Sequence, residues 1–167
     1  LMGKEGAGGT DNVNLTDQKL TITGDVSTIS NVNNFTDSTT GTVTATIANT
    51  TRVADLIGLT ADKANAKLTI ELSSDDSGVA TAGNLNTINA GTTQAVNISN
   101  IQALAASSIS DLSTLNTNIA GFSNTGNLAT ITLTDNGGAG TSVDFSTLEV
   151  VIDAYKDRVD GVSFQLQ

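Results

Sequence analysis

The chain repeats itself at a fixed offset, and this internal repeat limits the possible folds more than any other feature. Residues 26–32, VSTISNV, align with residues 79–85, VATAGNL, and the alignment runs on without a gap, so that Phe35 meets Ile88. Self-similarity at a fixed period is typical of arrays in which each unit buries its apolar face against the next one. We therefore interpret the chain as a short stretch of repeated units.

Each copy contains two patterns of apolar residues. Val26, Ile29 and Val32 lie at every third position, which keeps them on one side of a helix. Residues 42–47 then alternate, with apolar side chains at every second position, as in a strand with one buried face. Extended over the chain, these patterns predict strands near 19–23, 42–47, 67–72, 95–99, 128–133 and 161–166, and helices near 26–38, 51–60, 79–90, 102–119 and 144–157.

A helix between each pair of strands implies parallel pairing with right-handed crossovers, so the predicted fold class is α/β. The strands alternate instead of being apolar throughout, which favours a sheet covered by helices on one face only. We expect repeating strand–helix units that form an open parallel-sheet, solenoid-like array; a closed or doubly wound α/β domain is the alternative. The expected division is a glycine-rich lead-in or linker at 1–18, repeat unit one at 19–66, repeat unit two at 67–127 and a partial third unit at 128–167.

Composition excludes several kinds of chemistry. The chain has 7 basic and 17 acidic residues, a net charge of −10, and therefore lacks the basic footprint that nucleic-acid binding needs. It has no histidine and no cysteine, so Ser-His-Asp and Cys-His catalysis and zinc sites built on these residues are excluded. No segment is long and apolar enough for membrane insertion. The polarity comes from Thr, Asn, Ser and Gly, which is more typical of secreted and surface proteins, and both ends look cut from a longer protein.

Acidic side chains in loops after the predicted strands are candidates for calcium binding. Calcium prefers six to eight oxygen ligands, and these loops would stack along one edge of the sheet. The alternative is that loop residues of this kind, Asp25, Ser77 and Ser142, cap the helices that follow them. The candidate calcium ligands in these loops are Asp25, Asp75, Asp76 and Asp135.

A fifth candidate, Asp11, lies in GAGGTDNVN at residues 6–14, which matches the calcium-binding nonapeptide of RTX proteins except for Ala7. Residues 137–145, GGAGTSVDF, match the same nonapeptide poorly. RTX sites need tandem copies, so a flexible glycine linker at the start and a long turn at 137–140 are the alternatives.

Two further patterns bear on whether the protein is an enzyme. The glycine loop at 137–145 lies between a predicted strand and a predicted helix, as in nucleotide-binding sites, but it lacks the third glycine and the lysine of the usual phosphate-binding loops. Glu149, Asp153 and Asp157 recur at every fourth position on the last predicted helix, but the chain has one Tyr, four Phe and no Trp with which to build a sugar cleft. We expect a solvated helix face there, with Tyr155 packed against the core, and we expect the protein not to be an enzyme.

Residues 84–99, 31–47 and 109–112 resemble the Thr/Ala/Asn-rich repeats of giant secreted surface proteins of marine cyanobacteria and other Gram-negative bacteria. Such proteins are often exported by type I systems and often carry RTX calcium tracts. The resemblance implies an extracellular structural or adhesive segment that acts as a spacer, S-layer-like coat or stalk, and no catalytic residues come with it. Its expected partners are neighbouring repeats of the parent chain, other copies of itself or a cell-surface polymer. A calcium-dependent adhesin module and a virion or phage fibre segment are the alternatives.

Overall fold

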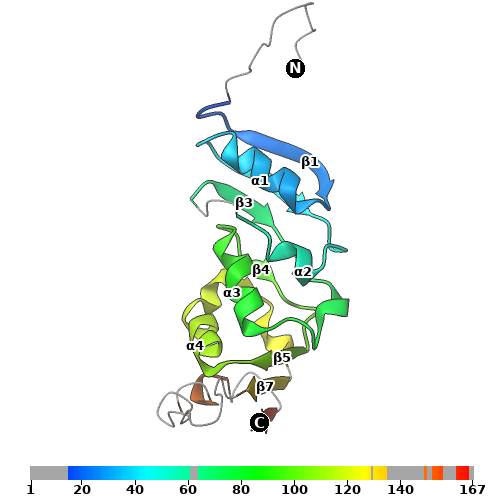
Figure 1. The fold of residues 1–167 in the computed structure, drawn as a ribbon, viewed down its shortest axis with the longest axis vertical. Helices are drawn as coiled ribbons and strands as arrows, with labels where there is room; N and C mark the ends of the chain where they lie inside the picture. The colour runs from blue at the N-terminus through cyan, green and yellow to red at the C-terminus, as the bar shows by residue number, and fades with distance from the viewer. Residues whose placement is uncertain are drawn as a thin grey trace, which may run out of the picture.

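A computed structural model describes residues 15–60, 64–128, 130–134, 149, 152–155 and 161–165. Strands and helices follow one another along the long axis of the molecule, from β1 and α1 near the N-terminal end to β7 near the other end (Figure 1). The strands are β1 (Leu20–Val26), β2 (Val43–Ile47), β3 (Ala66–Thr69), β4 (Val96–Asn97), β5 (Ala103–Ser107), β6 (Phe122–Ser123), β7 (Thr130–Thr134) and β8 (Gly161–Gln165). The α-helices are α1 (Ile29–Asp37), α2 (Val53–Leu56), α3 (Ala82–Ala90) and α4 (Ile109–Thr117), and the 3-10 helices are η1 (Ser74–Asp76), η2 (Ile119–Gly121) and η3 (Thr125–Asn127).

All pairings between these strands are parallel, which confirms the predicted α/β class. The strands form three small sheets, of order β1-β2-β3, β4-β6 and β5-β7-β8. An isolated parallel bridge between Glu71 and Asn97 extends the contacts from the end of β3 to β4. The single sheet expected from the sequence is therefore divided into three short ladders.

Paired strands are separated by similar lengths of chain. In the first four ladders, the stretch from a residue to its partner contains one α-helix and one or two strands, and we call such a length of chain a turn. Each turn thus lies beside the turn that follows it. The first pairs of the successive ladders are Leu20 with Val43, Val43 with Ala66, Val96 with Phe122, Ala103 with Thr130 and, across a somewhat longer stretch, Thr130 with Gly161.

The threefold apolar spacing correctly predicted the existence of α1 and α3. The two helices begin and end at equivalent positions of the two copies, and Val32 and its counterpart Leu85 are both fully buried. Both helices begin one helical turn later than predicted, because Thr28 and Thr81 have extended backbones and are the N-cap residues.

The alternating pattern of β2 is confirmed at the level of single side chains. Val43, Ala45 and Ile47 are buried, whereas Thr44 and Thr46 are exposed. Buried apolar residues from β2 onward to Tyr155 belong to one continuous cluster. The described elements therefore share a single hydrophobic core.

The predicted helix at 102–119 is wrong in its first part. Residues 103–107 form strand β5, which pairs with β7, and only Ile109–Thr117 is helical. The ALAAS sequence of β5 has a high intrinsic helix propensity, but pairing with neighbouring strands decides its conformation. The amide of Ala105, for example, donates to the carbonyl of Ala80 at 2.8 Å.

A glycine that follows a helix often takes a left-handed conformation, but Gly41 does not. Helix α1 ends at Ser38 with a right-handed cap, and the glycines with positive φ in the described part are Gly24 and Gly78. Gly41 is needed for a different reason: a Cβ at this position would overlap the backbone carbonyl of Gln18 in the preceding turn.

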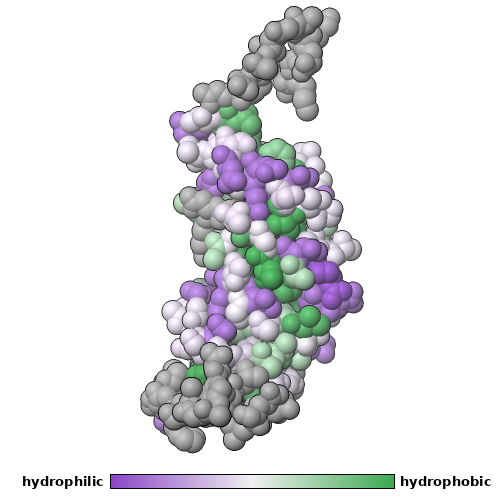
Figure 2. All heavy atoms as spheres, viewed as in Figure 1, coloured by the Kyte–Doolittle hydropathy of each residue, from purple (hydrophilic) through white to green (hydrophobic). Residues whose placement is uncertain are grey.

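On the face shown in Figure 2, hydrophobic residues form small areas separated by polar ones. The large apolar side chains that are exposed in the described part of the chain are Phe35, Ile57 and Val79. Among the described helices, none is long and apolar enough to span a membrane.

Candidate functional site

Asp75 and Asp76, two of the candidate calcium ligands, bind Arg52 of the preceding turn. The Nε atom of Arg52 donates to Asp76 Oδ1 at 2.9 Å, and its Nη1 atom lies 3.1 Å from Asp75 Oδ2. The other oxygen of Asp76 accepts from the amide of Val53, the first residue of α2, at 3.1 Å. Asp76 is 1% exposed, so its carboxylate is a buried link between two turns.

Of the other three candidate calcium ligands, the structure describes Asp25 alone. Asp25 lies exposed at the end of β1, while Asp11 and Asp135 lie outside the described residues. The RTX-like stretches at 6–14 and 137–145 also lie outside them. Within the described ranges, no three acidic side chains are grouped closely enough to hold a metal ion.

The capping roles suggested for Asp25 and Ser77 are wrong, and Ser142 lies outside the described residues. Helix α3 is capped by Thr81, whose hydroxyl accepts from the amide of Asn84 at 3.1 Å. The Ser77 hydroxyl instead accepts from the amides of Gln102 and Ala103 in the next turn, at 3.0 and 3.1 Å. Ser77 is thus another link between turns.

Two threonines at equivalent positions of the two copies make equivalent links. The Thr39 hydroxyl donates to the carbonyl of Gln18 at 2.7 Å and accepts from the amide of Gly41 at 2.9 Å. The Thr92 hydroxyl donates to the carbonyl of Leu68 at 3.0 Å and accepts from the amide of Gln94 at 3.1 Å. Both side chains are buried. Both threonines belong to Thr-Thr pairs that recur at equivalent positions of the two copies, but the sequence does not reveal their acceptors.

Two asparagines that are aligned by the repeat connect neighbouring helices. Asn33 Nδ2 donates to the carbonyl of Gly58 at 2.8 Å, across 25 residues of chain. Asn86 Nδ2 donates to the carbonyl of Asp111 at 2.9 Å, again across 25 residues. Sequence reasoning missed both asparagines, although their identity at equivalent positions was a usable signal.

Asp55 of α2 and Asp111 of α4 lie in different surroundings. Asp55 is exposed. Asp111 is half-buried, and its carboxylate accepts from the hydroxyl of Ser108, the N-cap of α4, at 2.8 Å. The carboxylate of Asp111 therefore supports the start of a helix, while its carbonyl receives the bond from the preceding turn.

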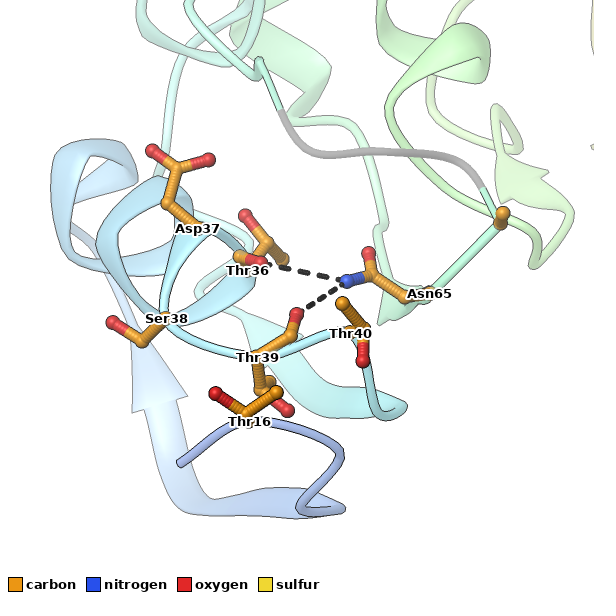
Figure 3. A pocket seen from close by; sticks show the side chains of 8 residues that line it. Thr16, Thr36, Asp37, Ser38, Thr39, Thr40 and Asn65 are labelled. Atoms are coloured by element: carbon orange, nitrogen blue, oxygen red, sulfur yellow. Dashed lines mark hydrogen bonds between the residues drawn. The ribbon is translucent and has the colours of Figure 1, made fainter. Parts of the chain in front are cut away.

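A polar pocket of about 340 Å³ opens where the end of α1 meets the next turn (Figure 3). Asn65, one of its lining residues, donates from Nδ2 to the carbonyls of Thr36 and Thr39, at 3.4 and 3.0 Å. One carboxylate, that of Asp37, belongs to its lining, and the hydroxyl of Thr40, also in the lining, donates to the carboxylate of Asp17. The pocket is suited to water and small polar groups, and it lacks the apolar walls of most ligand sites. Its lining consists of Thr16, Thr36, Asp37, Ser38, Thr39, Thr40, Ala64 and Asn65.

The carboxylates of Glu149 and Asp153 are exposed and line a shallow pocket of about 560 Å³ together with Asn116 and Ala154. Asp157 lies outside the described residues. Tyr155 is buried, and its hydroxyl donates to the carbonyl of Leu112 at 3.1 Å, which confirms the expected packing against the core.

Comparison with known protein families, curated proteins and solved structures found no match for this chain. The described contacts are therefore the basis for proposing what the protein does.

Proposed function

We propose that the chain is a structural segment of a large extracellular or cell-surface protein, where it acts as a spacer, coat element or adhesive stalk. The observation that carries this proposal is the recurrence of the same polar links between successive turns. Thr39 and Thr92 occupy equivalent places in the two copies, as do Asn33 and Asn86. A chain built from such links gains length without changing its cross-section.

The finer architecture in this proposal is an open, solenoid-like array of strand–helix turns. Its support is the similar length of chain between paired strands, the parallel direction of all described pairings, and the order of the elements along the long axis in Figure 1. In such arrays each unit contacts its neighbours, and stability is approximately the sum of unit and interface contributions.

A spacer role also agrees with the nature of the links. Buried polar groups that are hydrogen-bonded across turns fix the relative position of those turns, because leaving one unpaired costs about 1–3 kcal/mol. Asp76, Thr39 and Thr92 are buried groups of this kind. A net charge of −10 keeps a long acidic surface soluble and discourages non-specific association.

The cellular part of the proposal is tested on intact source cells. An antibody raised against the purified chain should label the cell surface, and external protease should remove the label while a cytosolic marker survives. Labelling that requires permeabilised cells would contradict the proposal.

The architectural part is tested by small-angle X-ray scattering of the purified chain. The distance distribution should be that of a rod, with a long tail beyond a single peak set by the cross-section. A symmetrical distribution would indicate a compact body and would contradict the array.

The calcium-dependent adhesin module is the alternative. It predicts that the Tm rises in millimolar calcium and falls again on chelation. Because Asp75 and Asp76 already bind Arg52, such a rise in Tm would have to persist in the Asp75→Asn variant and depend on other aspartates, such as Asp25.

The virion or phage fibre segment is the other alternative. It predicts a trimeric mass in light scattering.

A further inference from the structure

Asn65 and Gly121 occupy equivalent places in two contacts between successive turns. Each directly precedes the residue at which pairing with the strand of the earlier turn begins, Ala66 beside β2 and Phe122 beside β4. We call the contact that contains Asn65 the first interface and the contact that contains Gly121 the second interface. Asparagine brings a side-chain amide to this place, whereas glycine brings no side chain.

The helix that ends at each interface also differs at one buried position. Thr36 and Asn89 are the penultimate residues of α1 and α3, and the repeat places them at equivalent positions. They are 5% and 4% exposed. The first interface therefore combines Thr36 with Asn65, and the second combines Asn89 with Gly121.

At the first interface, the side-chain amide comes from the turn that follows the helix. Asn65 Nδ2 donates to the carbonyls of Thr36 and Thr39, at 3.4 and 3.0 Å, at the end of α1 (Figure 3). The Thr36 hydroxyl bonds within its own helix, where it donates to the carbonyl of Asn33 at 2.8 Å. The short threonine side chain thus leaves space for the amide of Asn65.

At the second interface, the side-chain amide comes from the helix itself. A Cβ on Gly121 would overlap the side-chain amide of Asn89, so this amide lies directly against the glycine. The missing side chain of Gly121 is what leaves space for it. Each interface therefore holds one amide, supplied by the following turn in the first case and by the helix in the second.

The oxygen atoms of both amides are buried without a partner. Neither Asn65 Oδ1 nor Asn89 Oδ1 accepts a hydrogen bond within the described part of the chain. A buried acceptor without a partner lowers stability. Buried asparagines that are retained at such a cost are best attested where they fix the register and the partner of packed helices. One such amide at each interface therefore favours a role in selecting the neighbouring turn.

We propose that this single buried amide determines which turn can stack on which helix. A turn with asparagine before its strand fits a helix with threonine at the penultimate position, and a turn with glycine fits a helix with asparagine. Mismatched neighbours bring two amides into one space or leave the space empty, so overlap or a cavity rejects them. The inference rests on the proposed array of turns and names what selects the neighbouring repeat unit within it.

The decisive experiment converts the second pair into the first, in the full chain, with Tm measured by circular dichroism. Asn89→Thr leaves a cavity and Gly121→Asn causes overlap, so each should lower the Tm by about 3 °C or more. The double variant Asn89→Thr/Gly121→Asn recreates the pair of the first interface. Its Tm should fall by at least about 3 °C less than the two single losses added together.

The reverse exchange at the first interface is an independent test. Thr36→Asn brings two amides into one space, and Asn65→Gly removes the donor to two carbonyls, so each should lower the Tm. The double variant Thr36→Asn/Asn65→Gly recreates the pair of the second interface. It should again be more stable than the sum of the single effects predicts, because the exchange restores one amide to the interface.

Gly126→Asn is the matched control, because nothing lies within 4 Å of a Cβ at this position. It introduces the same residue as Gly121→Asn at another glycine of the same region. Its effect on the Tm should be small, and it should add to that of Asn89→Thr without any recovery. If Gly121→Asn alone fails to fold, a folded double variant with Asn89→Thr is the expected rescue.

Additive losses in either exchange would overturn the proposal, as would a double variant with Asn89→Thr that fails to fold. Recovery of the same size with Gly126→Asn would also overturn it, because the coupling would then not depend on the shared space. Surface labelling and scattering test the proposed function separately. Failure there would leave the measured coupling unchanged, and additive losses here would leave the proposed location and shape untouched.

Discussion

The buried hydroxyl groups between turns have a larger effect than their small size suggests. Thr92 is 1% exposed, and its hydroxyl both donates to the carbonyl of Leu68 and accepts from the amides of Leu68 and Gln94. Removing this one oxygen leaves three backbone groups without their partner. The cost is set by the groups left behind, because a buried donor or acceptor without a partner loses its solvation and gains nothing in return.

We therefore expect Thr92→Val to lower the free energy of unfolding by about 1–3 kcal/mol, because valine keeps the shape but has no hydroxyl. Urea denaturation followed by circular dichroism measures the effect. Thr87→Val is the matched control: the Thr87 hydroxyl is exposed and donates within its own helix, to Gly83 at 3.0 Å. Equal losses in the two variants would contradict a special role for links between turns.

Asp76 offers the same comparison for a charged group. Asp76→Asn should destabilise the fold by about 1–3 kcal/mol, because the amide cannot accept at both positions from Arg52 and from the amide of Val53. Asp75→Asn should cost less than about 1 kcal/mol, because this side chain is 72% exposed and its ion pair is screened by water. Thermal or urea denaturation of the two variants at one pH checks the difference, and a larger effect at Asp75 would be the contrary result.

The roles of these residues could be predicted only in part. The sequence marked Asp75 and Asp76 as candidate calcium ligands, but their partner Arg52 lies 23 and 24 residues earlier in the chain and meets them only through the fold. A sequence pattern shows which residue types recur. It does not show which carbonyl or guanidinium the fold brings within hydrogen-bonding distance of them.

Helices and strands were predicted best where the apolar spacing is strict. The threefold spacing located α1 and α3, and the twofold spacing located β2. Prediction failed at β5, where ALAAS has neither spacing and where pairing with β7 outweighs the helix propensity of alanine. The division into three sheets depends on contacts between residues far apart in the chain, which local sequence does not encode.

Close approach between elements leads to a prediction about glycine. A Cβ on Gly41 would overlap the backbone of Gln18, just before β1, whereas nothing lies within 4 Å of a Cβ on Gly126. Gly41→Ala should therefore cost about 1–3 kcal/mol through overpacking. Gly126→Ala should be neutral or stabilise by up to about 1 kcal/mol, because alanine reduces the freedom of the unfolded chain. Tm values of the two variants test this, and a tolerated Gly41→Ala would show that the first two turns are separated more widely.

The described part of the molecule has one continuous core, and Tyr155 provides a natural fluorescent probe near its C-terminal end. The chain has one tyrosine and no tryptophan, so its intrinsic fluorescence comes from Tyr155. Tyr155 is buried in the same cluster as the residues of β2 and β3, which come much earlier in the chain.

We expect unfolding in urea followed by tyrosine fluorescence to coincide with unfolding followed by far-UV circular dichroism. Coincident transitions are the signature of one cooperative unit. Tyr155→Phe is the companion variant, and it should lower stability by about 1 kcal/mol by removing the bond to the Leu112 carbonyl. A fluorescence transition at clearly lower urea would show that the last helix unfolds separately.

The links between turns also bear on how the protein reaches its folded state. Thr39, Thr92 and Asn100 donate to carbonyls that precede them by only 21, 24 and 28 residues. Contacts that span 21 to 28 residues carry a smaller loop-closure penalty than contacts between the two ends of the chain would. In a nascent chain, the acceptor carbonyl of each of these links is therefore synthesised before its donor. Each link forms soon after its donor leaves the ribosome, so folding proceeds from the N-terminal end before synthesis is complete.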